Sequence, residues 1–280
     1  MIFKDLSGVY KDAYNFVHRN SNSILAGDLV DEKVFVTVNV IDKKVNSNDF
    51  CIVFINSENV DIWESIIDNY SDLNYTYFQN IKNQISTGSF TYLKEKFDIV
   101  FVMYDDLEDN YVLLKSMATN RFTIQDDANF IKDYNDVMVD VLTSICDNSY
   151  SRLGLVDLSI KNYVVDFWNI MQFYDSSILG SKENFKNKYC KLSYQVFGTK
   201  VVNGKQIPRK EDSVVGYRNL NDLEYLKSRF IFYLDGEQKK ENDVNNKEDL
   251  LSNIKNNEGI VVKENFNNIK HERKKKKVCI

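Results

Sequence analysis

Histidine, proline and cysteine are scarce in this 280-residue sequence, which has two histidines, one proline and four cysteines. The two histidines, His18 and His271, are far apart in the chain, which argues against a histidine-based metal site or catalytic triad. The cysteines are widely spaced and form no C-x-x-C pair, which argues against a zinc site or a disulfide framework. We therefore expect no metal centre.

Long apolar runs are also missing, since no stretch approaches the length needed to span a bilayer. The N-terminus shows no charged-then-apolar targeting signal. From these absences we expect an intracellular, cytoplasmic protein without membrane contact, or a nuclear one if its host is eukaryotic. Hydrophobic residues make up 43% of the chain and aromatic residues 13%, enough for the core of one large or two small domains.

The net charge of −5 is unevenly distributed along the chain. Lys270–Lys277 contains six basic residues and one acidic residue, so the remainder carries 30 basic and 40 acidic residues. An acidic body does not suit a protein that wraps nucleic acid with its whole surface. The tail could contact phosphates, act as a localisation signal or be a solvated end, and the solvated end is favoured. The candidate phosphate contacts are Lys270, Arg273, Lys274, Lys275, Lys276 and Lys277.

Short, continuous apolar runs recur along the first part of the chain, separated by segments with one apolar helical face. Such runs are typical of strands that are buried on both faces. Strands that alternate with helices predict an α/β fold, with a parallel sheet flanked by helices. The predicted strands cover 51–56, 74–78, 98–103, 121–125 and 152–158, and the helices between them cover 57–70, 110–117 and 134–146.

Beyond Ser159 the sequence changes in character. Helical patterns at 163–173 and 221–234 enclose a hairpin signal at Asn203-Gly204, because Asn-Gly suits a tight turn with positive φ. After Gly236 the chain is polar and rich in Asn, Lys and Glu. We therefore divide it into a sheet domain (1–158), a helical extension with a hairpin (159–235) and a polar, basic-ended tail (236–280).

The stretch Ser23–Ile41 looks like a phosphate-binding loop that lacks its glycines. An apolar run ends at Gly27-Asp28 and a lone lysine, Lys33, follows, but Val30 and Glu32 occupy two glycine positions. A plain strand and turn with a surface lysine is favoured about three to one. The residues after Lys33 are β-branched, which predicts a β-hairpin of residues 24–29 and 33–41, or at best a distorted helix start.

Six segments follow one another along the chain: SILAGDLVDEKV, CIVFINSENVDIWESII, FDIVFVMYDDLEDNYVLL, IQDDANFIKD, LGLVDLSIKNYVVDFW and VVGYRNLNDLEYLKSRF. In this order they resemble the motifs of the N-terminal ATPase lobe of the Swi/Snf-type, helicase-like translocases of superfamily two. The resemblance covers residues 9–235 and ends with VVGYRNLNDLEYLKSRF. It implies a RecA-like parallel sheet and places a nucleotide site on Lys33, Asp126 and Asp127. Residues that fall on the family's motif positions are Lys33, Trp63, Tyr104, Leu107, Asp126, Asp127, Ala128, Asn129, Ile131, Lys132, Leu155, Ile160, Asn162, Asp166 and Trp168.

The departures from the family pattern concern its chemistry. Lys11 replaces the adenine-reading Gln, Val34 the magnesium-holding hydroxyl, and Asp127 the Glu that activates water. Asn129 replaces the His that ends the acidic motif, and Val156-Asp157-Leu158 replaces Thr-Gly-Thr. No room remains after residue 235 for the second lobe with its arginine finger. The resemblance therefore implies vestigial nucleotide-binding residues (Lys33, Asp126, Asp127), no catalytic residue, and no use of ATP or Mg²⁺.

These observations predict a catalytically inactive, single-lobe scaffold that binds a protein partner within a larger nucleic-acid or transcription machine. One alternative is a weak half-motor that requires a separate second lobe. Another is a nucleic-acid binder that uses the basic tail. Asp126-Asp127 at a strand end is ordinary turn chemistry about as often as metal chemistry, and Trp63 and Trp168 are interpreted as core packing. The partner and the oligomeric state are not predicted by the sequence.

Overall fold

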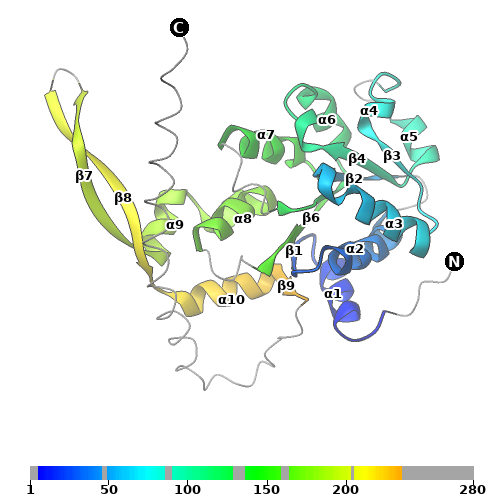
Figure 1. Ribbon diagram of the computed structural model, residues 1–280, viewed down its shortest axis with the longest axis horizontal. Coiled ribbons are helices and arrows are strands. Elements are labelled where there is room, and N and C mark those ends of the chain that lie inside the picture. The colour runs from blue at the N-terminus through cyan, green and yellow to red at the C-terminus, as the bar shows by residue number, and fades with distance from the viewer. Residues whose placement is uncertain are drawn as a thin grey trace, which may run out of the picture. The chain divides into compact units, whose positions relative to one another are not determined.

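A seven-stranded sheet forms the centre of the computed structural model (Figure 1), which describes residues 6–45, 49–85, 90–128, 136–158, 164–202 and 205–234. These residues belong to one compact unit, Met1–Gly236. The strand order is β3-β4-β2-β5-β6-β1-β9, and every neighbouring pair is parallel. The strands are β1 (Asn22–Ala26), β2 (Cys51–Ile55), β3 (Tyr75–Tyr77), β4 (Ile99–Met103), β5 (Phe122–Gln125), β6 (Ser151–Val156) and β9 (Ile231–Tyr233).

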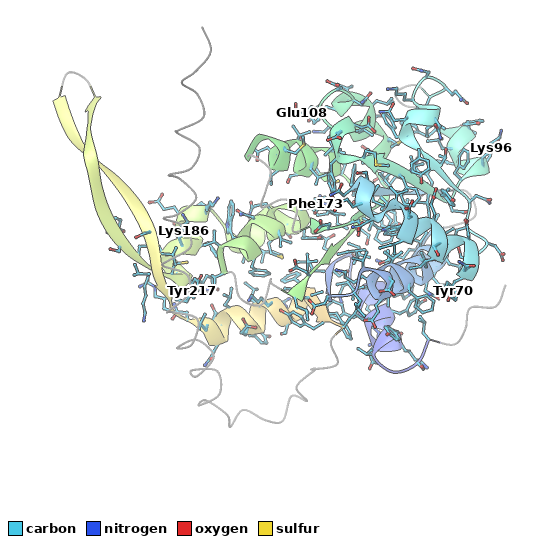
Figure 2. The ribbon with its side chains drawn as sticks, in the orientation of Figure 1. Tyr70, Lys96, Glu108, Phe173, Lys186 and Tyr217 are labelled. Carbon is cyan, nitrogen blue, oxygen red and sulfur yellow. The ribbon has the colours of Figure 1, made fainter. Side chains whose placement is uncertain are left out.

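The apolar runs of the sequence are the strands of this sheet, as predicted. All five residues of β2 are buried, because helices cover both faces of the sheet. One face packs against α1 (Gly8–Arg19), α2 (Val30–Lys44) and α3 (Val60–Tyr70). The other face packs against α4 (Phe78–Ile81), α5 (Thr91–Lys96), α6 (Tyr111–Ala118), α7 (Asp136–Cys146) and α8 (Val164–Leu179). Figure 2 shows the side chains that fill both layers.

The prediction of a β-hairpin at residues 24–41 is wrong, because the second half of this stretch is the helix α2. Its β-branched residues are buried, so tertiary packing outweighs their weak helix propensity. A helix is also the usual connection between parallel strands, here β1 and β2. Acidic residues occupy the first turn of α2 and basic residues the last, which complements the helix dipole.

The second half of the chain contributes to the sheet, which the sequence pattern did not predict. The helix expected at 221–234 is α10 (Leu220–Phe230), and it stops where β9 begins. β9 then pairs in parallel with β1, at one edge of the sheet. Residues 231–233 of the helical pattern are therefore a strand, because Ile231 and Phe232 bury their side chains against the sheet layers.

A long antiparallel hairpin lies between the helix α9 (Lys182–Tyr189) and α10. It consists of β7 (Cys190–Val202) and β8 (Lys205–Tyr217), so its strands extend further than the sequence pattern indicated. Its expected turn, Asn203-Gly204, lies outside the described residues. The basic tail at 270–277 and the motif positions Asn129, Ile131, Lys132, Ile160 and Asn162 also lie outside them. Among the described helices, none is long and apolar enough to cross a membrane.

Candidate nucleotide site

The carboxyl ends of β1, β5 and β6 bring the predicted nucleotide-binding residues to one edge of the sheet. A three-residue loop, Gly27–Leu29, connects β1 to α2 there, and Lys33 lies in the first turns of α2. Asp126 follows β5 directly, and Asp157 follows β6 directly. In open parallel sheets, ligands bind at this edge, so the arrangement has the position of a nucleotide site.

Lys33 is buried rather than on the surface, with 5% of its area exposed. Its Nζ donates hydrogen bonds to the carbonyl oxygens of Gly27, at 2.7 Å, and Val156, at 3.0 Å. Two of the three N–H donors of the ammonium group are therefore bonded to backbone carbonyls of the protein itself. Burial lowers the pKa of Lys33, and the nearby carboxylates of Asp126 and Asp157 oppose that shift.

The backbone around the ammonium group is tied together by further hydrogen bonds. The N–H of Gly27 donates to the same Val156 carbonyl at 3.0 Å, and the N–H of Leu234 donates to the carbonyl of Ala26 at 2.8 Å. A Cβ atom on Gly27 would lie 3.2 Å from the Cβ of Leu234, so glycine suits this close approach. The segment after β9 therefore packs on the loop that would hold a phosphate.

Asp126 is also held inside the protein, with 1% of its area exposed. Its carboxylate accepts a hydrogen bond of 2.9 Å from Nδ2 of Asn59, and its carbonyl accepts one of 2.6 Å from the hydroxyl of Tyr104. Burial raises the pKa of Asp126 to about 6, although the Asn59 amide and the Trp63 indole N–H favour its charged form. The carboxylate thus lies in a polar but water-poor environment.

Asp127 is the neighbouring acidic residue and forms the turn after β5. Its φ of 52° is left-handed, a conformation that aspartate tolerates better than most residues. Magnesium in such a site is held by carboxylate, hydroxyl and phosphate oxygens, yet Val34 offers no hydroxyl and Asp126 already accepts from Asn59. Within the described residues, no group of three or more His, Cys, Asp or Glu side chains is placed to hold a metal ion. Val34 therefore leaves the donor set for magnesium without its hydroxyl.

The N-terminus of α2 carries two carboxylates of the chain itself. An oxygen of Asp31 accepts the backbone N–H of Glu32 at 3.0 Å, and Glu32 accepts the hydroxyl of Tyr10 at 2.8 Å. The hydrogen bond to Glu32 raises the pKa of the Tyr10 phenol. A helix N-terminus attracts anions, and here two side chains already place negative charge at that end.

Sequence reasoning named the residues that gather at this edge but not the residues that hold them. Lys33, Asp126 and Asp127 lie together, as the resemblance implied. Asn59 and Tyr10 were missed, because they contact the site from other elements and belong to no motif. Trp63 is fully buried and packs on Phe101, so its core interpretation is confirmed.

The fold is similar to that of two solved structures from Sulfolobus solfataricus. One is a SWI2/SNF2 ATPase core in complex with double-stranded DNA, with a TM-score of 0.56 and 23% sequence identity over 67% of this chain. The other is a SWI2/SNF2 ATPase core domain, with a TM-score of 0.52 and 22% identity over 66% of this chain. This chain spans only 39% and 38% of their lengths. No protein-family model and no curated protein matches the chain. The likeness shows the fold alone, an α/β, RecA-like arrangement of a parallel sheet flanked by helices.

Proposed function

We propose that this chain is a helicase-like lobe that does not hydrolyse ATP and serves as a binding or regulatory scaffold in a larger nucleic-acid or transcription machine. The observation that carries the proposal is the position of Lys33, whose ammonium group is buried and bound to two backbone carbonyls. Phosphoryl transfer needs such a lysine on the phosphates, together with a metal ion and an oriented water.

The electrostatics of the site support the same proposal. Asp31 and Glu32 lie in the first turn of α2, and Asp28 precedes that helix. A triphosphate would approach these carboxylates before it reached the buried lysine, and like charges repel. In addition, Val30 and Glu32 bring side chains where a phosphate-binding loop exposes bare backbone N–H groups.

The half-motor is the second candidate, and one observation favours it. α2 is a regular helix that starts at the carboxyl edge of the sheet, and Lys33 and Asp126 lie close to each other there. That geometry is common to phosphate-binding turns. A half-motor would still require a separate lobe to supply the remaining catalytic groups.

Calorimetric titration with Mg-ATP decides between these two candidates. We expect no saturable binding up to millimolar nucleotide, either for the natural chain or for Lys33→Met. The variant should instead lower the free energy of unfolding by about 1–3 kcal/mol, because two buried carbonyls lose their hydrogen-bond donor. Lys43→Met is the matched control, since Lys43 lies on the same helix with 60% of its side chain exposed.

Saturable binding in the micromolar range that is lost in Lys33→Met, and retained in Lys43→Met, would contradict the proposal and establish the half-motor's nucleotide site. ATP hydrolysis should be measured on the same samples, with and without double-stranded DNA. Partners captured from the source cell then identify the machine to which the scaffold belongs.

A further inference from the structure

The edge strand β3 presents two tyrosines beside a row of carboxylates. β3 is the last strand of the sheet at the end opposite β9, and no strand of the described residues pairs with its outer side (Figure 1). Tyr75 and Tyr77 point to the face that packs against α3, and both are partly exposed. Their rings rest on Phe101, at centroid distances of 5.7 and 5.6 Å.

The helix α3 supplies the carboxylates on this surface. Glu64 accepts the hydroxyl of Tyr77 at 2.5 Å, while Asp61 and Asp68 are exposed on the same helix. Within the part of the chain that the structure describes, none of these three acids forms an ion pair. Residues 45–81 contain six acidic residues and no lysine, arginine or histidine, so this segment carries no cation of its own.

The α3 carboxylates also contribute, after burial, to the raised pKa values of the two phenol groups. The pKa of Tyr75 is raised by burial and by the charges of Glu64 and Asp68. The pKa of Tyr77 is raised by burial and by its hydrogen bond to Glu64. A potential that disfavours a phenolate favours a cation at the same place, and aromatic faces attract cations as well.

We infer that the β3 edge, formed by Tyr75, Tyr77 and the α3 carboxylates Asp61, Glu64 and Asp68, is a docking surface for an extended, lysine- or arginine-rich segment of a partner protein. The choice of this occupant rests on charge complementarity, since an acidic surface without cations of its own excludes acidic segments and nucleic acid. The inference deepens the proposed scaffold function by stating the chemistry of the partner.

An extended segment suits the geometry because none of the described strands pairs with the outer edge of β3. A strand added there would form backbone hydrogen bonds with β3, the mode known as β-augmentation. Side chains at alternate positions of the added strand would then lie over the face that carries Tyr75 and Tyr77. The expected recognition pattern is therefore a basic residue at every second position.

The test is a fluorescence-anisotropy titration of the full chain with a labelled peptide that alternates threonine and lysine over about ten residues, a usual strand length. We expect saturable binding that weakens with added salt. Replacing every lysine of the peptide by glutamate should abolish binding. Hydrogen exchange should slow at residues 74–78 when the lysine peptide is present.

Two variants of the surface test its composition. The double variant Asp61→Asn, Asp68→Asn should weaken binding of the peptide at least threefold. The control is the double variant Glu108→Gln, Asp109→Asn, at an exposed pair outside this surface, which should leave binding unchanged. Tyr75→Leu keeps the packing on Phe101 but removes a cation-binding face, and should weaken binding about two- to fivefold. Tyr225→Leu, at a tyrosine of α10 that is 68% exposed, is its control.

This inference would be overturned if the lysine and glutamate peptides bound equally well, or if no saturable binding were seen. It would also be overturned if each surface variant had the same effect on binding as its control variant. The Mg-ATP titration on the same sample separates it from the proposed function. A chain that binds neither ATP nor the peptide is an inactive lobe whose partner docks elsewhere. A chain that binds both ATP and the peptide supports the docking surface but contradicts the proposal that the lobe is inactive.

Discussion

At the scale of single residues, Asp126 links the structure of the site to the stability of the protein. Its pKa of about 6 in the folded chain is higher than the ordinary value of 3.8, mainly because the carboxyl group is buried. The folded state therefore binds this proton more tightly than the unfolded state. Between about pH 4 and pH 6 this residue's contribution to stability falls as the pH rises, and above pH 6 the full cost of an ionised, buried carboxylate is present.

Asp126→Asn should remove this pH dependence. Relative to the natural chain, the variant should gain about 3 kcal/mol of unfolding free energy between pH 4 and pH 7, because a pKa shift of one unit corresponds to about 1.4 kcal/mol. Urea denaturation at several pH values measures the difference. The same substitution at the exposed Asp105 controls for the change of charge. A difference that stays constant across this pH range would contradict the elevated pKa.

Lys33 shows how a motif residue can keep its position and change its partners. Its place after the β1 loop is the one that the resemblance assigned, but its ammonium group faces Gly27 and Val156. The sequence cannot indicate this, because Val156 lies far along the chain on another strand. Only the pairing of β1 with β6 brings the two together.

At the scale of elements, the packing of α8 on the sheet depends on one glycine in β6. A Cβ atom on Gly154 would lie 1.4 Å from the hydroxyl oxygen of Tyr174 and 2.6 Å from its Cζ. Gly154 and Tyr174 are both buried, and the Tyr174 hydroxyl has no hydrogen-bond partner among the described residues. The absence of a side chain at Gly154 therefore sets how closely α8 can approach the sheet.

A double-mutant cycle tests this contact. Gly154→Ala should lower the free energy of unfolding by about 1–3 kcal/mol, because the added methyl group overfills a packed layer. Tyr174→Phe alone should change stability little, since it removes an unpaired hydroxyl. The double variant should recover part of the loss, because the shortest of the clashes is gone. Strictly additive effects in chemical denaturation would show that the two residues do not contact each other.

The helix α2 illustrates the limit of local propensity. Val34, Val36, Val38 and Val40 favour a strand by their intrinsic preference, yet all four are buried in a helix. The free energy gained by burying them between the sheet and the neighbouring helices exceeds their small propensity differences. A strand pattern of alternating β-branched residues is therefore ambiguous when the whole segment is buried.

At the scale of the whole molecule, the charge distribution bears on nucleic-acid binding. The six basic residues at Lys270–Lys277 contrast with a remainder in which acidic residues exceed basic ones by ten. We expect DNA binding to be weak, to fall steeply with salt concentration and to depend on this tail, because phosphate contacts release counterions.

Deleting residues 270–277 should therefore abolish binding of a short DNA duplex in an anisotropy titration at low salt. Deletion of the equally long, polar segment 241–248 is the control for shortening the chain. Tight binding that survives loss of the basic segment would favour a nucleic-acid track on the folded lobe itself. That result would favour the half-motor over the inactive scaffold.

The sequence by itself determined the sheet and its layers. The runs that became β2 and β4 are apolar throughout, because strands in the middle of a covered parallel sheet are buried on both faces. The helices between them carry one apolar face, which the periodicity shows directly. The family resemblance, and not the strand pattern, assigned Lys33 and Asp126 to one site.

Only the tertiary structure decided what those residues do there. The conformation of α2, the addition of β9 to the sheet and the hydrogen bonds of Lys33 and Asp126 all depend on contacts between residues far apart in the chain. Local propensities differ by fractions of a kcal/mol, about 0.7 at most for ordinary residues, whereas burial of a large apolar side chain contributes about 1.5–3 kcal/mol. Tertiary burial therefore outweighs local preference wherever the two conflict.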